Sequence, residues 1–288
     1  AAELLNNNGK VLNSGVELTL GWSDFVNEDF KYNIGLNLTT VSNKVVELQG
    51  RDYIPGASVR GAYTTRTQVG YPIGAFWGYE IDGVFASEED VRNYPVQQAI
   101  KAPGYFKYRD VDGNGVIDEA DKTYLGSPVP VLTGGLEFGF LWKSLDFSVG
   151  FYSQIGNKVL NAKRMNRDVF TDGNYDLDFY QNAWRPDRPS QTYPSAAAYN
   201  TAFIQQANSF FVEDASYLRI QNIQVGYTFR NLRQISSMRI SFTAQRPFTF
   251  LRYNGFTPEV SGSPIASGVD MSTYPMQGIY TLGLKLSF

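Results

Sequence analysis

The segment Tyr280-Thr281-Leu282-Gly283-Leu284-Lys285-Leu286-Ser287-Phe288 alternates large apolar residues with small or polar ones at every step. A period of two is the spacing that places side chains on opposite faces of a β-strand. The same alternation recurs upstream in six segments, which are residues 16–22, 32–38, 136–142, 145–151, 223–229 and 238–242. The chain is therefore predicted to be all-β, with each strand apolar on one face and polar on the other.

The connections between these segments alternate between short and long. Short links join neighbouring strands into antiparallel hairpins, whereas the connections at about 44–130, 156–210 and 252–276 are long. Brief periplasmic turns and large extracellular loops give an outer-membrane β-barrel this rhythm. Aromatic residues near strand ends, such as Trp22, Trp142 and Tyr280, suit an interfacial belt. We therefore expect a multi-pass transmembrane β-barrel whose apolar rows contact outer-membrane lipid.

Two features suggest that the chain is part of something larger. Seven strands are an odd number, while bacterial single-chain barrels have even numbers. The first residues, AAELLNNNGK, contain neither an initiator Met nor the apolar core of a signal peptide. We expect residues 1–288 to be the C-terminal part of one larger barrel domain, or a chain whose leader has been removed.

Composition restricts the chemistry available. The 288 residues include no His and no Cys, which excludes Ser-His-Asp triads, HExxH metal sites and thiolate chemistry. Lys and Arg number 25 against 28 Asp and Glu, so the positive charge typical of a nucleic-acid binder is missing. No run approaches the roughly 18 apolar residues of a membrane-spanning helix. We predict that the protein is not an enzyme and binds no nucleic acid.

A calcium-binding loop is predicted in the first long connection, at residues 110–121. It reads DVDGNGVIDEAD, which places oxygen ligands at positions 1, 3, 5, 9 and 12, Gly at position 6 and a backbone carbonyl at position 7. Position 12 is Asp instead of the usual Glu, so its carboxylate has a shorter reach. The alternative is a turn rich in Asp and Asn without metal. The expected ligands of a structural Ca²⁺ are Asp110, Asp112, Asn114, the Val116 carbonyl, Asp118 and Asp121.

Aromatic residues interleaved with glycine precede this loop in the segment 70–79. Such residues can stack against a sugar or against partner side chains, and they can equally pack against one another inside a large loop. The candidate substrate or partner contacts are Phe76, Trp77 and Tyr79, together with Trp184 in the second long connection.

Several motifs, in this order, resemble the C-terminal portion of the SusC/RagA family of TonB-linked outer-membrane proteins. They are GKVLNSGVE at 9–17, the Gly74/Phe76/Gly78/Tyr79 block followed by Gly83-Val84-Phe85, GYFKYRD at 104–110 before the DxDGNGxID loop, Trp184-Arg185-Pro186, VEDASYLRIQNI at 212–223, Phe248-Thr249-Phe250, GFTPE at 255–259 and the terminal Phe288. The chain has Gln245-Arg246-Pro247 where the family usually shows Gly-Gln-Asn, which we expect to change only a local strand bend.

This resemblance implies a TonB-dependent transporter with a barrel of about 22 strands and an N-terminal plug. It also implies a SusD-like surface lipoprotein as partner and import of glycans or peptides. The plug and the segment that contacts TonB are absent from this chain.

Two alternatives follow from the residues alone. A secreted, calcium-stabilised β-sandwich that binds carbohydrate would bury the apolar faces between two sheets. A glycosidase would need two converging carboxylates, for which Asp172, Asp176 and Asp178 are candidates without any sequence feature that selects a pair.

Overall fold

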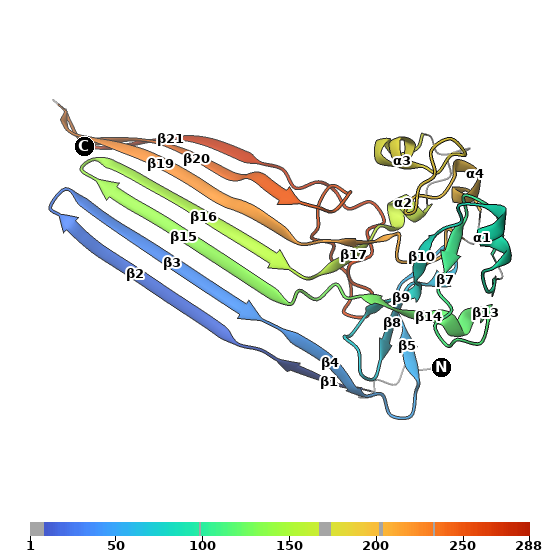
Figure 1. Cartoon of the computed structure of the whole chain (residues 1–288). Coiled ribbons are helices and arrows are strands. Elements are labelled where there is room, and N and C mark those ends of the chain that lie inside the picture. Colours follow the sequence, from blue (N-terminus) through green and yellow to red (C-terminus); the bar gives the residue numbers. More distant parts are fainter. Residues whose placement is uncertain (1–8, 98, 167–173, 202–203, 233) are drawn as a thin grey trace, which may run out of the picture.

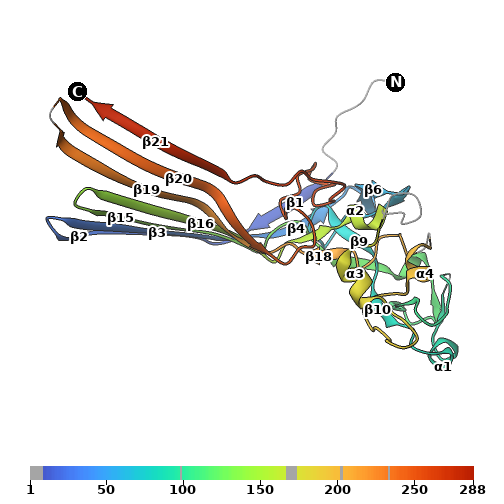
Figure 2. The same ribbon diagram turned by 90° about the horizontal axis from the view of Figure 1, so that it is seen from above.

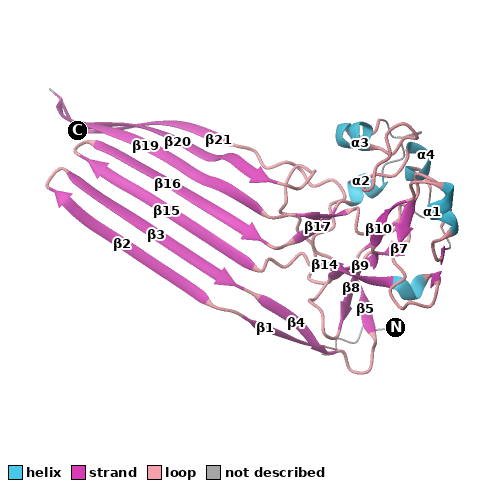
Figure 3. Ribbon diagram, viewed as in Figure 1, coloured by secondary structure: helices cyan, strands magenta, loops and turns pink. Residues whose placement is uncertain are grey.

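The computed structural model of this chain describes residues 9–97, 99–166, 174–201, 204–232 and 234–288. The molecule has two parts: one long, open sheet, and a compact region at one end of it (Figure 1). All helices lie in the compact region (Figure 3). The expectation about a leader concerns residues 1–8, which lie outside the described residues, as does Asp172.

The large sheet contains seven strands that pair in sequence order, each antiparallel to its neighbours. They are β2 (Glu17–Asn27), β3 (Phe30–Thr40), β15 (Leu132–Trp142), β16 (Leu145–Ile155), β19 (Tyr217–Leu232), β20 (Ile235–Leu251) and β21 (Ile279–Ser287). Each coincides with one of the seven predicted segments, so the predicted all-β, antiparallel fold is confirmed. Strands of 11 residues, such as β3, match the roughly 9–11 residues that a tilted strand needs to cross a bilayer.

The strand register separates the two faces of the sheet as the alternation predicted. Leu36 pairs with Leu136, which pairs with Phe151, whereas the neighbouring row places Glu137 between Gly35 and Gly150. Several glycines of the polar face leave room for asparagine side chains from the adjacent strand. A Cβ at Gly139 would lie 2.7 Å from Asn33 Oδ1, and one at Gly150 would lie 2.5 Å from Asn222 Oδ1. Glycine is therefore needed here for lateral space between strands.

A register shift interrupts the β19–β20 pair between Ile220 and Asn222, opposite the Gln245-Arg246-Pro247 segment. Arg246 has a φ of 50°, in the left-handed region. Pro247 cannot donate a ladder hydrogen bond, and proline inside a strand is tolerated at such bulges. The unusual tripeptide therefore lies at a β-bulge.

No second layer covers the seven-stranded sheet within the described part of the chain (Figures 1 and 2). The apolar side chains on one face are more exposed than those of a sheet in a soluble protein. Leu282 is 79% exposed, and the same face includes the exposed side chains Leu18, Leu20, Trp22, Ile34, Leu136, Ile240, Phe242, Tyr280 and Leu284. A β-sandwich would bury this face against a partner sheet. The β-sandwich alternative is therefore wrong for the described residues.

Across the described residues, no helix combines the length and the apolar character required to traverse a membrane.

Outside the large sheet the chain forms many short elements, most of them in the three long connections that build the compact region. A four-stranded sheet comprises β14 (Lys122–Gly126), β9 (Ala75–Tyr79), β8 (Thr65–Gln68) and β5 (Tyr53–Pro55), in that order. Two-stranded pairs are β1 (Lys10–Ser14) with β4 (Ser42–Glu47), β6 (Ser58–Val59) with β7 (Ala62–Tyr63), β10 (Ile81–Val84) with β12 (Phe106–Tyr108), β11 (Val96–Gln97) with β13 (Val116–Ile117), and β17 (Lys158–Leu160) with β18 (Val212–Asp214). The helices are α1 (Glu88–Arg92), the 3₁₀ helix η1 (Glu119–Asp121), α2 (Ala162–Asn166), α3 (Leu177–Asn182) and α4 (Ala196–Tyr199).

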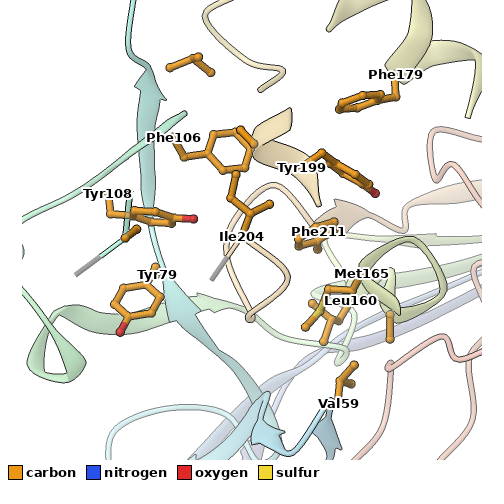
Figure 4. Packing of buried hydrophobic residues seen from close by; sticks show 14 of the residues in the cluster. Val59, Tyr79, Phe106, Tyr108, Leu160, Met165, Phe179, Tyr199, Ile204 and Phe211 are labelled. Carbon is orange, nitrogen blue, oxygen red and sulfur yellow. The ribbon is translucent and has the colours of Figure 1, made fainter. Parts of the chain in front are cut away.

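The main hydrophobic core lies in this compact region instead of on the sheet. Phe106 and Tyr108 from the first long connection pack with Ile204 and Phe211 from the second (Figure 4). Val269 from the third connection packs against the same cluster. The three connections therefore fold as one body, because each buries its apolar residues against the others.

A buried arginine links distant parts of the second connection. Arg164 Nη2 lies 2.9 Å from Asp178 Oδ2, and Arg164 also forms ion pairs of 3.6 Å with Asp176 and Glu213. Its side chain is only 5% exposed. The carboxylates raise the pKa of the Arg164 guanidinium, although its burial acts in the opposite direction. Asp176 and Asp178 thus serve as counter-ions to one cation, which does not favour them as a catalytic carboxylate pair.

The third connection is held by a buried carboxylate. Asp270 accepts hydrogen bonds from the Tyr253 hydroxyl at 2.5 Å and from the backbone N–H groups of Ser272 and Thr273. Burial raises the pKa of the Asp270 carboxyl, but the hydrogen bonds outweigh burial and hold this pKa below its usual value. The charged form is therefore the one that the fold stabilises.

Acid is expected to loosen residues 252–276. Because the folded-state pKa of Asp270 is lowered, its contribution is present above the unfolded pKa of about 3.9 and is lost as pH falls through the lower folded pKa. Hydrogen exchange of this segment between about pH 6 and pH 3 measures the effect. Asp270→Asn should remove the acid-dependent step, and a step of unchanged size in that variant would contradict the assignment.

Candidate functional site

The predicted calcium loop folds as a tight acidic turn at the edge of the compact region. It starts after β12, contains the short strand β13 and ends in η1. The carboxylates of Asp110, Asp112 and Asp121 each offer an oxygen, and these oxygens lie within 4.8 Å of one another. The structure therefore brings together positions 1, 3 and 12 of the predicted loop.

Backbone hydrogen bonds give this loop its shape. Asp110 accepts from the N–H groups of Gly113 and Gly115, each at 2.7 Å. Gly113 and Gly115 have φ angles of 74° and 84°, which glycine adopts without strain. The bond from Gly115 is the largest influence on Asp110, and together with the other bonds it lowers the pKa of that carboxyl. Asp110 is thus held as an anion facing the turn.

The remaining predicted ligands occupy the same turn. Asn114 Oδ1 accepts from the Val116 N–H at 2.7 Å, and Asp118 Oδ1 caps η1 by accepting from the Ala120 N–H at 2.8 Å. Asp121 is fully buried and accepts from the N–H groups of Val111 and Asp118. The donor set consists of hard oxygens on one curled segment, which suits Ca²⁺. Asp121 already makes two internal bonds, so a cation there would share its carboxylate with the backbone.

The aromatic candidates have different positions. Phe76 and Tyr79 are predicted contacts that the structure instead places in the core, with exposed fractions of 0% and 1%. They are buried because β9 lies between β8 and β14, inside the four-stranded sheet. Trp184 is partly buried and packs on Gly104, where a Cβ would lie 2.7 Å from its ring. Trp77, on β9, lines a cavity with a volume of about 530 Å³.

The polar face of the large sheet carries a second group of charged and amide side chains that the sequence did not single out. Arg219 forms a 2.7 Å ion pair with Glu259, and the Tyr217 hydroxyl donates to Glu259 Oε1 at 2.7 Å. Arg219, Glu259, Asn37 and Glu137 line a cavity of about 330 Å³ over this face. Charged and amide groups therefore gather on the face opposite the apolar row. Arg219 and Glu259 lie in two of the motifs that carry the family resemblance, at 212–223 and 255–259, to which the sequence assigned no role.

The chain is similar in sequence to several curated receptors, although a scan of protein-family models found no match. TonB-dependent receptor P3 of Formosa agariphila is 28% identical over 299 aligned residues, covering 99% of this chain and 29% of the receptor. TonB-dependent receptor SusC of Bacteroides thetaiotaomicron is 28% identical over 304 aligned residues, covering all of this chain and 27% of the receptor. This chain thus spans less than a third of the length of these relatives.

The fold is similar to that of solved transporter structures. The RagAB peptide transporter structure superposes with a TM-score of 0.72 at 21% identity, covering 97% of this chain and 30% of the solved chain. The RagAB peptide importer in its "closed-closed" state gives a TM-score of 0.69 at 22% identity. The seven-stranded sheet and the compact region therefore have a RagA-type arrangement. Over nearly its whole length the chain is thus similar in sequence to TonB-dependent receptors, SusC among them, and similar in fold to RagAB.

Proposed function

We propose that this chain is part of an outer-membrane transporter that imports nutrients in a TonB-dependent manner. The observation that carries the proposal is the seven-stranded sheet, with one exposed apolar face and an opposite face of Gly, Asn, Ser and charged residues. Lipid on the first face and water on the second is the environment that such strands require. The SusC and RagAB relatives support the same function.

The compact region is proposed to lie outside the cell. It is formed by the long connections, which all emerge at the same end of the sheet (Figure 1). At the other end, tight links join β2 to β3 and β15 to β16, as periplasmic turns do in such barrels. A SusD-like lipoprotein is the proposed partner on the compact region, and glycans or peptides are the proposed substrates. TonB would act through parts of the parent protein outside this chain.

The test uses the full-length parent protein in its native host. We expect it in the outer-membrane fraction, extractable only with detergent, and we expect growth on its substrate to be lost when TonB is deleted. Affinity purification of the parent should recover a surface lipoprotein. Recovery of the parent as a detergent-free soluble protein would show that the proposed function is wrong.

We further propose that the loop at residues 110–121 binds a structural Ca²⁺. Asp110, Asp112 and Asp121 converge within 4.8 Å, and Asn114, Asp118 and the Val116 carbonyl would complete an oxygen shell. The ion would supply positive charge to a turn that concentrates carboxylates. It would stiffen the turn between β12 and β14 without taking part in transport chemistry.

Asp112→Ala is expected to abolish the effect of calcium on the stability of this loop. Asp112 is the best probe because its oxygens bond only to Asn114 in the described structure, at 3.0 Å, so its removal breaks little else. Hydrogen exchange across residues 108–124 is measured with calcium and with chelator. The wild type should lose protection in chelator, whereas Asp112→Ala should be insensitive. Equal exchange in the wild type under both conditions would contradict the site.

A further inference from the structure

A positively charged cavity lies within the compact region, close to β5, β8 and β9. It has a volume of about 530 Å³ and is lined by residues from five separate stretches of the chain, including Tyr53, Arg66, Trp77, Glu119, Lys122 and Gln206. This volume is within the range of sites that bind small ligands. The β6–β7 hairpin forms part of its wall, with Arg60 and Gly61 in its two-residue turn. Both turn residues have positive φ, as a type I′ turn requires.

Arg66 is held between two aromatic rings at this cavity. Its Cζ lies 3.9 Å from the Tyr53 ring centroid and 4.5 Å from that of Trp77. Stacking on aromatic rings leaves the in-plane N–H groups of a guanidinium for hydrogen bonds. Arg66 Nη1 donates one long hydrogen bond, of 3.5 Å, to Gln68 Oε1. The group is therefore fixed in place with most of its donor capacity unused.

Arg66 also lacks a close counter-ion. Within the described residues, no carboxylate oxygen lies within 4.0 Å of its guanidinium. The nearby Glu119 is engaged elsewhere, since its Oε2 pairs with Lys122 at 2.7 Å and its Oε1 accepts from Tyr79 at 3.2 Å. Burial lowers the pKa of the Arg66 guanidinium, while Tyr53 and Glu119 act in the opposite direction. The charge of Arg66 is only weakly compensated by the protein.

The wall as a whole attracts anions. Arg60, Arg66 and Lys122 contribute three positive charges and Glu119 one negative charge, which leaves a formal charge of +2. A further donor is the Trp77 indole N–H, which is buried without a hydrogen-bond partner. Buried donors normally have partners, so this one indicates a missing acceptor. A guanidinium whose in-plane donors are free is suited to a planar, two-oxygen anion.

We propose that this cavity binds a carboxylate group carried by the ligand, with Arg66 as the bidentate donor and Trp77 Nε1 as a supporting donor. This inference deepens the proposed function. It rests on that function in one respect: the bound ligand is taken to be the transported substrate. The carboxylate can belong to an acidic sugar or to the C-terminus of a peptide, because both present the same two oxygens.

The test measures binding to the purified full-length receptor in detergent by isothermal titration. Four probes are compared: digalacturonate, its dimethyl ester, trialanine with a free C-terminus, and trialanine amide. At least one carboxylate probe should bind more tightly than its neutral counterpart. Preferential binding of digalacturonate alone would identify an acidic sugar as the ligand, and preferential binding of trialanine alone would identify a peptide C-terminus. Preferential binding of both would show that the site recognises the carboxylate itself. Binding of neither carboxylate probe, or equal binding of a carboxylate and its neutral analogue, would overturn the proposal.

Arg66→Gln should weaken the preferred carboxylate probe by about 10- to 100-fold, as expected for loss of charged hydrogen bonds. Arg66→Lys keeps the positive charge but loses the planar pair of N–H donors. Its affinity for the probe should therefore lie between those of the wild type and Arg66→Gln. Arg51→Gln is the matched control, since Arg51 is exposed and does not line the cavity. If Arg66→Gln bound the probe as the wild type does while remaining folded, Arg66 would not be the donor.

Failure of this inference can be separated from failure of the proposed function. Binding to the purified receptor does not depend on TonB, whereas uptake by cells does. If uptake depended on TonB but substitution of Arg66 did not change carboxylate binding, the inference would be contradicted and the proposed function would stand. Carboxylate binding that depends on Arg66, in a parent protein that is not in the outer membrane, would remove the proposed function alone.

Discussion

Arg164→Met is expected to destabilise the compact region of the full-length protein by about 3–5 kcal/mol. Arg164 is buried and forms ion pairs with Asp176, Asp178 and Glu213. Methionine preserves much of the packing but removes the cation, so the three carboxylates repel one another without compensation. Hydrogen exchange of residues 156–214 measures the local loss of stability.

Two controls isolate the charge effect. Arg188→Met removes an exposed arginine from the same connection and should change exchange by little. Adding Asp178→Asn to Arg164→Met should recover part of the lost protection, because one unpaired carboxylate is neutralised. Similar protection in Arg164→Met and Arg188→Met would show that the ion cluster is not what holds this connection.

Leu284→Arg is expected to cost about 2–4 kcal/mol of folding free energy in the membrane, as measured for arginine near the bilayer midplane on a lipid-facing strand. Leu284 lies in the middle of β21, pairs with Ile240 on β20 and is 65% exposed on the apolar face. Urea unfolding of the full-length protein in lipid vesicles, followed by its shift in gel mobility, gives the difference.

The matched control is Thr281→Arg, which places the same charge on the polar face opposite Thr243. The adjacent Gly283 is less suitable, because a Cβ there would lie 2.7 Å from Ser241 Oγ and add a steric cost. Thr281→Arg should be tolerated if the polar face meets water. Equal costs for the two variants would contradict the assignment of the apolar face to lipid.

The strands could be predicted because alternation is a local property. Their lengths could not, and β19 shows the reason. It begins at Tyr217, six residues before the predicted 223, because the register shift between Ile220 and Asn222 changes the phase of the pattern. Leu218 and Ile220 are on even positions, while Ile223 and Val225 are on odd ones. A strict period of two therefore ends at the bulge although the strand continues.

The candidate sites also contain features that the sequence could predict and features that it could not. The acidic loop was visible in the sequence because its oxygens are at most 12 residues apart and the glycines between them impose the turn. The burial of Phe76 and Tyr79 was not visible, because it depends on β8 and β14 flanking β9. Trp77, on the same strand, is also largely buried but lines a cavity, and this difference too depends on the packing around β9.

The sequence by itself determined where the seven strands lie, which face of each is apolar and where the acidic loop turns, because all of these depend on residues a few positions apart. The tertiary structure alone decided that, among the described residues, no second sheet covers the apolar face. It also decided that Arg164 gathers three carboxylates and that Arg66 meets Trp77 and Gln206 in one cavity. Contacts between residues as far apart as 66 and 206 arise only when the long connections pack together, and no local pattern records that packing.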